Sequence, residues 1–283
     1  MLLTVVAANF VLAMRTETSA VRNAISVAQA EALANGAVHR SLYEVFRQTA
    51  DPSNWRPDGQ ERRWETDGAT IEVVVMDETG KIDINTSSDA LLKSLFLSVG
   101  VGEEKATQLL DAVLDWRDAD SLPRPNGAER DAYRAAGLKY EPANAPFEAV
   151  EQLQQVLGMT PDIYARIAPM ITVYSRQPGV NTLVASRGVL LAIPDVTPVQ
   201  VDQYIEQRQQ SFASGQPTPQ FPAGGAYASP AINSIINVRA AARMPDGAVY
   251  VREATARWSG EARRPVAFLS WKEGRSAVAP APQ

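Results

Sequence analysis

One long helical pattern at the start of the chain constrains the fold more than any other feature. Apolar residues recur at spacings of three and four, as in Val38, Leu42 and Val45, until Asp51-Pro52 interrupts the pattern. This periodicity is typical of an amphipathic helix, and proline cannot continue one. We therefore expect a single helix over residues 1–50.

The beginning of this helix is apolar on every side. The run MLLTVVAANFVLAM is followed by Arg15, and fourteen residues at ~1.5 Å each reach only about 21 Å, against ~30 Å for the hydrocarbon core of a bilayer. No basic n-region or small-residue cleavage site indicates a secretory signal peptide. We favour a membrane anchor truncated at its N-terminus, and a buried core helix is the alternative.

Two β-rich regions enclose a helical one. The segment ATIEVVVMDETGKIDIN predicts a strand, a turn at Gly80 and a short second strand after a polar loop. Near the C-terminus, INSIINVRAAARM, AVYVREATARWSG and PVAFLSWKEG predict three strands, the middle one with Tyr250 and Arg252 among the residues of one face. Between them the chain is helical from about Thr86 to Gln210, and a Pro/Gly/Ser linker leads back to the sheet.

This order predicts an α+β protein with an insertion. The long helix over 1–50 would pack on an antiparallel sheet domain formed by residues 51–85 and 228–275. Residues 86–227 would form an inserted all-helical domain with its return linker.

The helical region contains three related turns, VGVGEEKATQLL, LGMTPDIYARIA and IPDVTPVQVDQYI. Gly100, Gly158 and Asp195 align, and two places later the residues are Gly102, Thr160 and Thr197. Threonine followed by proline is typical of a helix N-cap with proline at the first helical position. We interpret the repeats as packing units and expect both glycines of the first copy to serve tight helix packing.

The first copy also resembles the helix-hairpin-helix turn that binds nucleic-acid phosphates. A phosphate needs bare backbone N–H groups, which Thr-Pro does not supply in the other copies. Glu103 and Glu104 at the following helix start would repel a phosphate, and the net charge is −5 with a pI of about 5.1. We therefore predict no nucleic-acid partner, and a helix-hairpin-helix nucleic-acid-binding protein remains the alternative.

An acidic, turn-rich segment, LDWRDADSLPRPNGAERD, follows the first long helix of this region. Its oxygen-bearing side chains are Asp115, Asp118, Asp120, Asn126, Glu129 and Asp131. Calcium prefers six to eight oxygen ligands, although the spacing is not that of an EF-hand. We predict a calcium site with Asp118, Asp120 and Glu129 as ligands; helix capping and exposure to water are the alternative.

Catalysis has little support in the sequence. There is no cysteine, His39 is the single histidine, and no phosphate-binding loop or dinucleotide fingerprint occurs. A hydrolase that uses the acidic segment is the weaker rival and would need two carboxylates in one cleft. We predict that the protein is not an enzyme and has no catalytic residues or organic cofactor.

Several separated motifs carry a family resemblance. DETGKIDIN, LDWRDADSLPRPNGAERDAY, VEQLQQVLGMTPDIYARIAPMITVYS and GVNTLVASRGVLLAIPDV occur in the order found in general secretion pathway protein K. The chain resembles this minor pseudopilin family of type II secretion systems. The resemblance implies a pilin-like fold with an inserted SAM-like (helix-hairpin-helix) domain. It also implies a structural role at the pseudopilus tip, in protein export across the outer membrane, and an association with calcium.

The same resemblance implies partners and a location. The partners would be the I-type and J-type minor pseudopilins and secreted substrate proteins, with the helix in the inner membrane and the globular part in the periplasm. Family members begin with a basic leader and a full transmembrane helix, whereas this chain starts inside that helix. We expect the shortened helix to contact partner helices through Leu2, Leu3, Val5 and Phe10.

Overall fold

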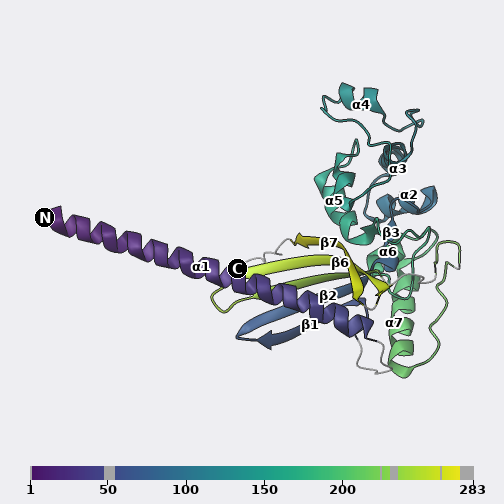
Figure 1. Ribbon diagram of the computed structural model, residues 1–283. Coiled ribbons are helices and arrows are strands. Elements are labelled where there is room, and N and C mark those ends of the chain that lie inside the picture. Colours follow the sequence, from purple (N-terminus) through teal and green to yellow (C-terminus); the bar gives the residue numbers. More distant parts are fainter. Residues whose placement is uncertain (1, 48–54, 224, 230–234, 262, 275–283) are drawn as a thin grey trace. The chain divides into compact units, whose positions relative to one another are not determined.

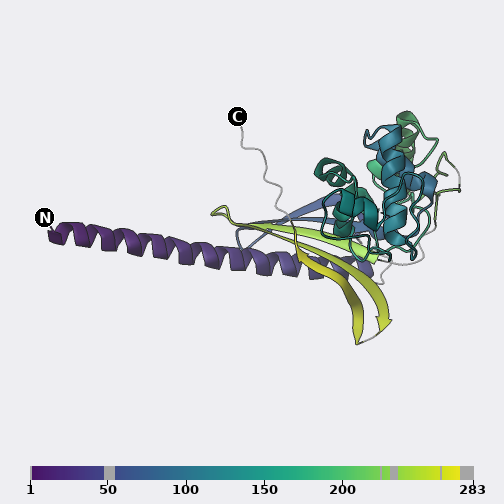
Figure 2. The same cartoon turned by 90° about the horizontal axis from the view of Figure 1, so that it is seen from above.

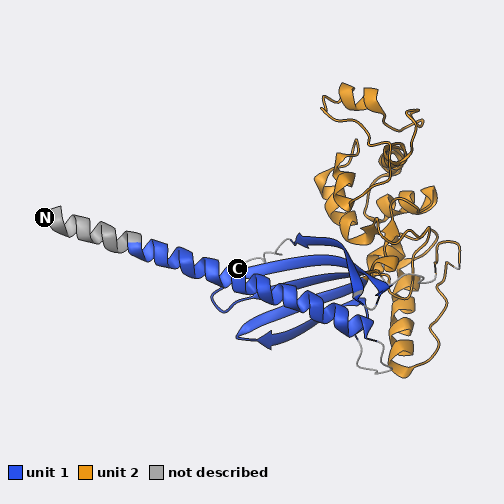
Figure 3. Cartoon of the chain, viewed as in Figure 1, with its two compact units in different colours: residues 1–76, 236–283 blue, residues 77–235 orange. Residues whose placement is uncertain are grey.

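The chain forms two compact units (Figure 3). Unit 1 comprises residues 1–76 and 236–283, and unit 2 comprises residues 77–235. This computed structural model describes the backbone of residues 2–47, 55–223, 225–229, 235–261 and 263–274, and the side chains of these ranges from Met14 onward, apart from Arg264.

Unit 1 consists of one long helix and a five-stranded sheet. Helix α1 (Leu2–Phe46) precedes β1 (Asp58–Thr66) and β2 (Ala69–Asp77), and the later strands are β5 (Ile235–Arg243), β6 (Val249–Glu261) and β7 (Arg264–Glu273). The strand order is β1-β2-β5-β6-β7, with antiparallel pairing of β1 with β2 and of β6 with β7. Figures 1 and 2 show the C-terminal half of α1 along this sheet. The predicted helix and all four predicted strands of the sheet are present.

Alanines dominate the contact between α1 and the sheet. Ala30, Ala34 and Ala37 of the helix are buried against strand residues that include Ala254 and Ala256. Short side chains let the helix lie close to the strands, so a modest apolar area is buried over a long contact. The core of unit 1 is therefore thin.

A buried arginine ties the helix to β6. Arg252 is 7% exposed, and its guanidinium donates from Nε to Asn35 Oδ1 and from Nη2 to Glu31 Oε1, each at 2.8 Å. Ser26 Oγ donates to Asp246 Oδ1 at 2.8 Å in the turn before the same strand. These bonds fix the position of α1 along the sheet, because charge-assisted hydrogen bonds have narrow geometry.

The interpretation of the stretch before Ala69 as a polar loop was wrong for Asp58–Thr66, because these residues form strand β1. Trp64 pairs with Ile71, and the pairing ends at Thr66 opposite Ala69. β1 is an edge strand with mostly polar, exposed side chains, so the apolar alternation that identifies a strand is weak. Its partner strand β2, by contrast, alternates buried and half-buried residues throughout.

Unit 2 is helical around a larger core. Its helices are α2 (Asp89–Ser98), α3 (Glu103–Arg117), α4 (Arg130–Ala135), α5 (Pro161–Ile167), α6 (Arg187–Leu191) and α7 (Pro198–Ser214), with short 3-10 turns at Glu78–Gly80, Val150–Gln155 and Ala168–Met170. The strands β3 (Ile82–Asp83) and β4 (Ile171–Thr172) pair in parallel. Large side chains such as Phe96, Leu109 and Trp116 fill the centre.

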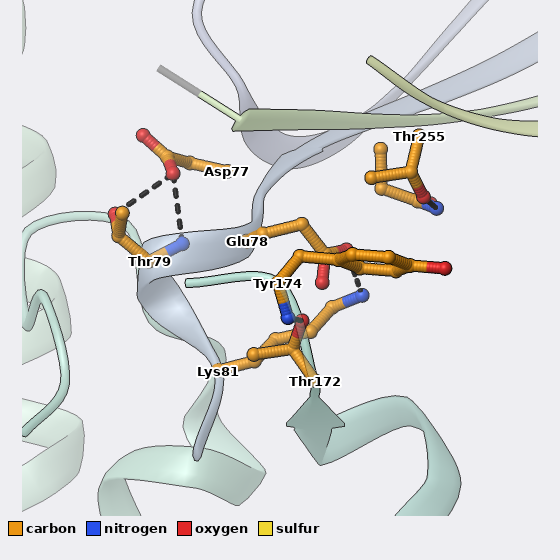
Figure 4. Close-up of polar contacts among 8 residues, drawn as sticks. Asp77, Glu78, Thr79, Lys81, Thr172, Tyr174 and Thr255 are labelled. Atoms are coloured by element: carbon orange, nitrogen blue, oxygen red, sulfur yellow. Dashed lines mark hydrogen bonds and ion pairs between the residues drawn. The ribbon is translucent and has the colours of Figure 1, made fainter. Parts of the chain in front are cut away.

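A buried polar network begins unit 2 (Figure 4). Asp77 Oδ1 accepts from the backbone N of Thr79 at 2.9 Å and from its hydroxyl at 2.7 Å, and Glu78 pairs with Lys81 at 2.6 Å. Asn181 donates to Thr79 Oγ1 at 3.3 Å. The unit therefore begins at Asp77 and ends at Ile235, outside the expected limits of 86 and 227. The reason is that the short second strand pairs with β4 and not with the large sheet.

Candidate functional site

The three repeated turns have the same backbone geometry. Gly100, Gly158 and Asp195 all adopt positive φ, at 83°, 86° and 62°. Two residues later, the N-caps of α3, α5 and α7 are Gly102, Thr160 and Thr197. The sequence alignment of the repeats is thus matched by a left-handed residue followed by an N-cap in every copy.

The first two turns are covered by basic side chains from unit 2 itself. Arg166 of α5 donates from Nη1 to the carbonyl of Val99 at 2.5 Å, directly before Gly100. At the second turn, a Cβ added to Gly158 would lie 2.5 Å from Lys105 Nζ of α3. Each turn is thus occupied by a side chain from the helix that follows the other, which indicates a packing role for the repeats.

Only one of the two glycines in the first turn has a backbone conformation that requires glycine. Gly100 has φ +83°, where other residues are strained. Gly102 has φ −66°, and a Cβ there would meet no described atom within 4 Å. The expectation that Gly102 serves tight packing was therefore wrong: it is an N-cap without a capping side chain.

A buried carboxylate organises the acidic segment. Asp115, in the last turn of α3, is fully buried and accepts from the backbone N of Arg124 with both oxygens at 3.2 Å. A Cβ on Gly127 would lie 2.0 Å from Asp115 Oδ2, so no other residue fits there without rearrangement. Asp115 therefore has a structural role in folding the loop between α3 and α4.

Two oxygens of the acidic segment and one of the following loop are buried without a hydrogen-bond donor. They are Asp118 Oδ1, Glu129 Oε1 and Asn144 Oδ1. Asp118 is the C-cap of α3, while Glu129 is the N-cap of α4 and only 6% exposed. Asn144 has φ +46°, and its Nδ2 donates to the carbonyl of Asp120 at 2.6 Å. Buried acceptors usually have partners, so these three require an explanation such as a cation or water.

The surroundings of Asp118 and Glu129 disfavour the negatively charged forms of both carboxyl groups. Burial raises the pKa of Asp118, and repulsion by Asp120 adds to the shift. Burial also raises the pKa of Glu129, with further contributions from Asp115, Asp118 and Asp120. A nearby cation would remove this penalty, because it favours the ionised form of both carboxyl groups.

The other acidic-segment residues have different roles. Asp120 is exposed and its Oδ1 accepts from the backbone N of Leu122 at 2.8 Å, and Asn126 donates its backbone N and its Nδ2 to Asp111 Oδ2, each at 3.0 Å. Among the described residues, no three His, Cys, Asp or Glu side chains form a ready metal-binding group. Any cation would thus need amide and carbonyl oxygens as well. The sequence analysis missed Asn144, whose signal is an asparagine within two residues of a proline on either side, in EPANAPF.

The residues predicted to contact partner helices lie at the start of α1. The side chains of Leu2, Leu3, Val5 and Phe10 lie outside the described residues. Within the part of the chain that is described, no helix is both long and apolar enough to cross a membrane.

The single histidine packs among aromatic rings. His39 is exposed on α1, with ring centroids 5.7 Å from Phe268 in an edge-on arrangement and 5.6 Å from Trp271. His39 therefore packs against the β7 side of the β6–β7 hairpin.

Comparison with protein families identifies the region that includes these features. Residues 72–176 match the family model described as "Type II secretion system (T2SS), protein K". The chain resembles the K protein of type II secretion. This match includes the acidic segment and the first two repeats, and it confirms the resemblance indicated by the sequence motifs.

Curated relatives carry the same name. "Type II secretion system protein K" of Pectobacterium carotovorum subsp. carotovorum is 27% identical over 200 residues, which cover 63% of this chain and 60% of the relative. The protein of the same name from Pseudomonas aeruginosa is 25% identical over 233 residues, covering 75% and 70%. The alignments thus span about 60% of the length of the Pectobacterium protein and also of the Klebsiella pneumoniae protein.

A solved structure shares the fold. The chain matches one from "the GspK-GspI-GspJ complex from enterotoxigenic Escherichia coli Type 2 Secretion System" with a TM-score of 0.60 and 16% identity. The match covers 93% of this chain and 99% of that one. The predicted α+β fold, with its long helix, antiparallel sheet and helical insertion, is confirmed. These comparisons give no support to the nucleic-acid-binding alternative.

Proposed function

We propose that this protein is a structural minor pseudopilin at the tip of a type II secretion pseudopilus, where it takes part in protein export across the outer membrane. The observation that carries the proposal is the protein K match over residues 72–176. That range lies almost entirely in the helical unit, which distinguishes this chain from a plain helix-and-sheet subunit. The shared fold over 93% of the chain adds support.

The proposed partners are the I-type and J-type minor pseudopilins, in line with the composition of the complex that contains the structural relative. Contact with secreted substrate proteins is a further part of the proposal. The location would be the inner membrane, with the globular part in the periplasm. We propose no catalytic role, because the named relatives are secretion components.

Co-purification tests this assembly. The full chain in detergent should be monomeric alone and should form a one-to-one-to-one complex with the I-type and J-type proteins of its own secretion system. Light scattering after size-exclusion chromatography gives the stoichiometry. Failure of the wild-type chain to join either protein would overturn the proposed function.

We also propose that the acidic segment binds calcium through Asp118, Glu129 and Asn144, with Asp120 contributing through its carbonyl or carboxylate. Support comes from the three buried oxygens without donors and from the raised pKa values of the two carboxyl groups. Calcium accepts carboxylate, amide and carbonyl oxygens together, so a group of three carboxylates is not required. Bound calcium would neutralise the repulsion in the loop and stabilise the folded unit.

A further inference from the structure

An aromatic groove lies in unit 1 between the end of α1 and the hairpin of β6 and β7, which Figure 2 shows beside each other. The groove has a volume of about 390 Å³, and Tyr43 of α1, Trp258 of β6 and Phe268 of β7 are among the residues that line it. Tyr43 is 66% exposed and Phe268 is 42% exposed. The described part of the chain therefore leaves this apolar surface accessible to a ligand.

Two groups of aromatic rings lie at the groove. His39, Phe268 and Trp271 form the first group, in which the ring centroids of Phe268 and Trp271 are 4.9 Å apart. Phe46 and Trp258 form the second group, with ring centroids 5.3 Å apart. Rings that pack against one another in this way are held in place before a ligand binds. Grooves lined by aromatic rings bind proline-containing peptides in the polyproline II conformation.

The segment that follows the sheet has matching chemistry. Residues 275–283 have the sequence RSAVAPAPQ and lie outside the described residues. From Ala277 to Pro282 the sequence is uncharged and apolar, and each proline follows an alanine. Proline fixes its own φ and disfavours the helical region for the residue before it. A peptide of this composition therefore favours extended conformations and loses little conformational entropy on binding.

The position of Gly274 determines how far this segment reaches. The backbone N of Gly274 donates to the carbonyl of Val251 at 2.9 Å, which fixes the start of the segment beside β6. Phe268 lies six residues before Gly274, which corresponds to about 20 Å along β7 at ~3.3 Å per residue. Pro280 and Pro282 lie six and eight residues after Gly274, or about 19 and 25 Å at ~3.1 Å per residue. A segment that turns back along β7 therefore brings its prolines to the groove.

We propose that the aromatic groove is a binding site for an extended, proline-containing peptide, and that its occupant is the segment 275–283 of the same chain. The two Ala-Pro pairs lie against the aromatic rings and cover them. Because the segment is tethered at Gly274, its effective concentration at the groove is on the order of 1 mM. If a free peptide of this sequence binds with a Kd of about 0.1 mM, the tethered segment occupies the groove about 90% of the time.

The inference does not rest on the proposed function, because it concerns one chain without any partner. An occupied groove removes apolar surface from water in the isolated chain, where such a surface would otherwise promote association.

A free peptide tests the inference. The probe is a fluorescein-labelled peptide with the sequence of residues 275–283, and fluorescence anisotropy measures its binding to the full chain in detergent. The double variant Pro280→Ser with Pro282→Ser should free the groove and bind the peptide about tenfold more tightly than the wild type, whose own segment competes. The matched control Ala277→Ser with Ala281→Ser retains both prolines and should bind the peptide as weakly as the wild type.

A change in the groove shows where the peptide binds. Tyr43→Ser, added to the proline double variant, should weaken peptide binding about fivefold or more without loss of folding, because Tyr43 lines the groove and is exposed. The same peptide with both prolines replaced by serine should not bind. Equal binding of the original peptide to the wild type and to the proline double variant would overturn the inference. Absence of binding to both at millimolar peptide would also overturn it.

Cross-linking supplies a second readout without added peptide. The chain contains no cysteine, so Gln283→Cys in the full chain can carry a single benzophenone. The benzophenone should attach to residues 39–47 at the end of α1, and mass spectrometry locates the attachment. Adding Pro280→Ser and Pro282→Ser should remove most of this product. Attachment spread over the whole chain, or attachment that does not depend on the prolines, would overturn the inference.

Discussion

The two units contrast in the groups that they leave without partners. In the described part of unit 1, an apolar stretch of α1 is exposed: Met14, Val21 and Ile25 each have about half of their surface exposed, at 49%, 54% and 53%. In unit 2, the unpartnered groups include polar atoms that are buried, among them the oxygens of Asp118 and Glu129. The first kind of surface is completed by protein and the second by a cation or water.

The hydrophobic cores of the two units also differ in the size of the side chains that fill them. Unit 1 packs alanines between helix and strands, whereas unit 2 buries Phe96, Trp116 and Tyr133. Trp116 and Phe147 stack with their ring planes 12° apart. A thin core leaves large side chains of unit 1 available outside, while unit 2 uses its large side chains for its own stability. Unit 1 therefore resembles an assembly element, and unit 2 a self-contained domain.

Truncation of a core side chain should reveal this difference most strongly. Phe96→Ala removes a ring that is 1% exposed and should lower the free energy of unfolding by about 3–5 kcal/mol. In unit 1, where the helix presents alanines to the sheet, Ala34→Gly removes only one methyl group and should cost about 1 kcal/mol, mainly through helix propensity. Urea denaturation followed by circular dichroism measures both. Equal losses would contradict the contrast between the two cores.

Calcium should have the next largest effect. A ligand that binds only the folded state at one hundred times its Kd adds about 2.7 kcal/mol, which raises Tm by roughly 5–11 °C for a domain of this size. The double variant Asp118→Asn with Glu129→Gln should lose this increase. Differential scanning calorimetry with calcium and with chelator measures the shift. If millimolar calcium did not change the Tm of the wild type, the calcium site would be contradicted, and helix capping would remain as the role of the acidic segment.

The pH dependence should have opposite sign with and without calcium. The raised pKa values of Asp118 and Glu129 mean that the folded state binds protons more tightly than the unfolded state. Without calcium, stability should therefore fall as pH rises from about 4 through these raised pKa values. With calcium it should rise over the same range, because protons compete with the cation. The double variant should flatten both slopes, leaving the contributions of the other buried carboxyl groups, Asp77 and Asp115. Identical slopes in the wild type would exclude a shared site for calcium and protons.

The smallest effects separate the two glycines of the first repeat. Gly100→Val should cost about 1–2 kcal/mol, because φ is +83° there. Gly102→Ser should instead add a few tenths of a kcal/mol, since serine can cap α3 at this position. Thermal melts of the two single variants measure the difference. Destabilisation by both would restore the packing role expected for Gly102.

The sequence predicts local structure well where one segment carries its own signal. Periodicity indicates α1, β-branched residues indicate β2, and Thr-Pro marks the starts of α5 and α7. Edge strand β1 escapes prediction because pairing with β2, and not apolar alternation, holds it in place.

The sites were less predictable because they join distant segments. The acidic segment is visible in the sequence, but Asn144 enters it from beyond α4, and burial of Asp115 gives that residue a structural role. The ring contact between His39 and Phe268 likewise joins residues that lie far apart along the chain. Composition alone cannot indicate such tertiary contacts.

Position in the filament tests the central claim most directly. A subunit with an inserted helical unit between two strands of its sheet can attach through unit 1 and end the filament, since open assemblies grow by heterologous contacts. Antibody or gold labels on this chain, viewed by electron microscopy on isolated pseudopili, should appear once, at one end. Labels repeated along the shaft would contradict the assignment as a tip subunit.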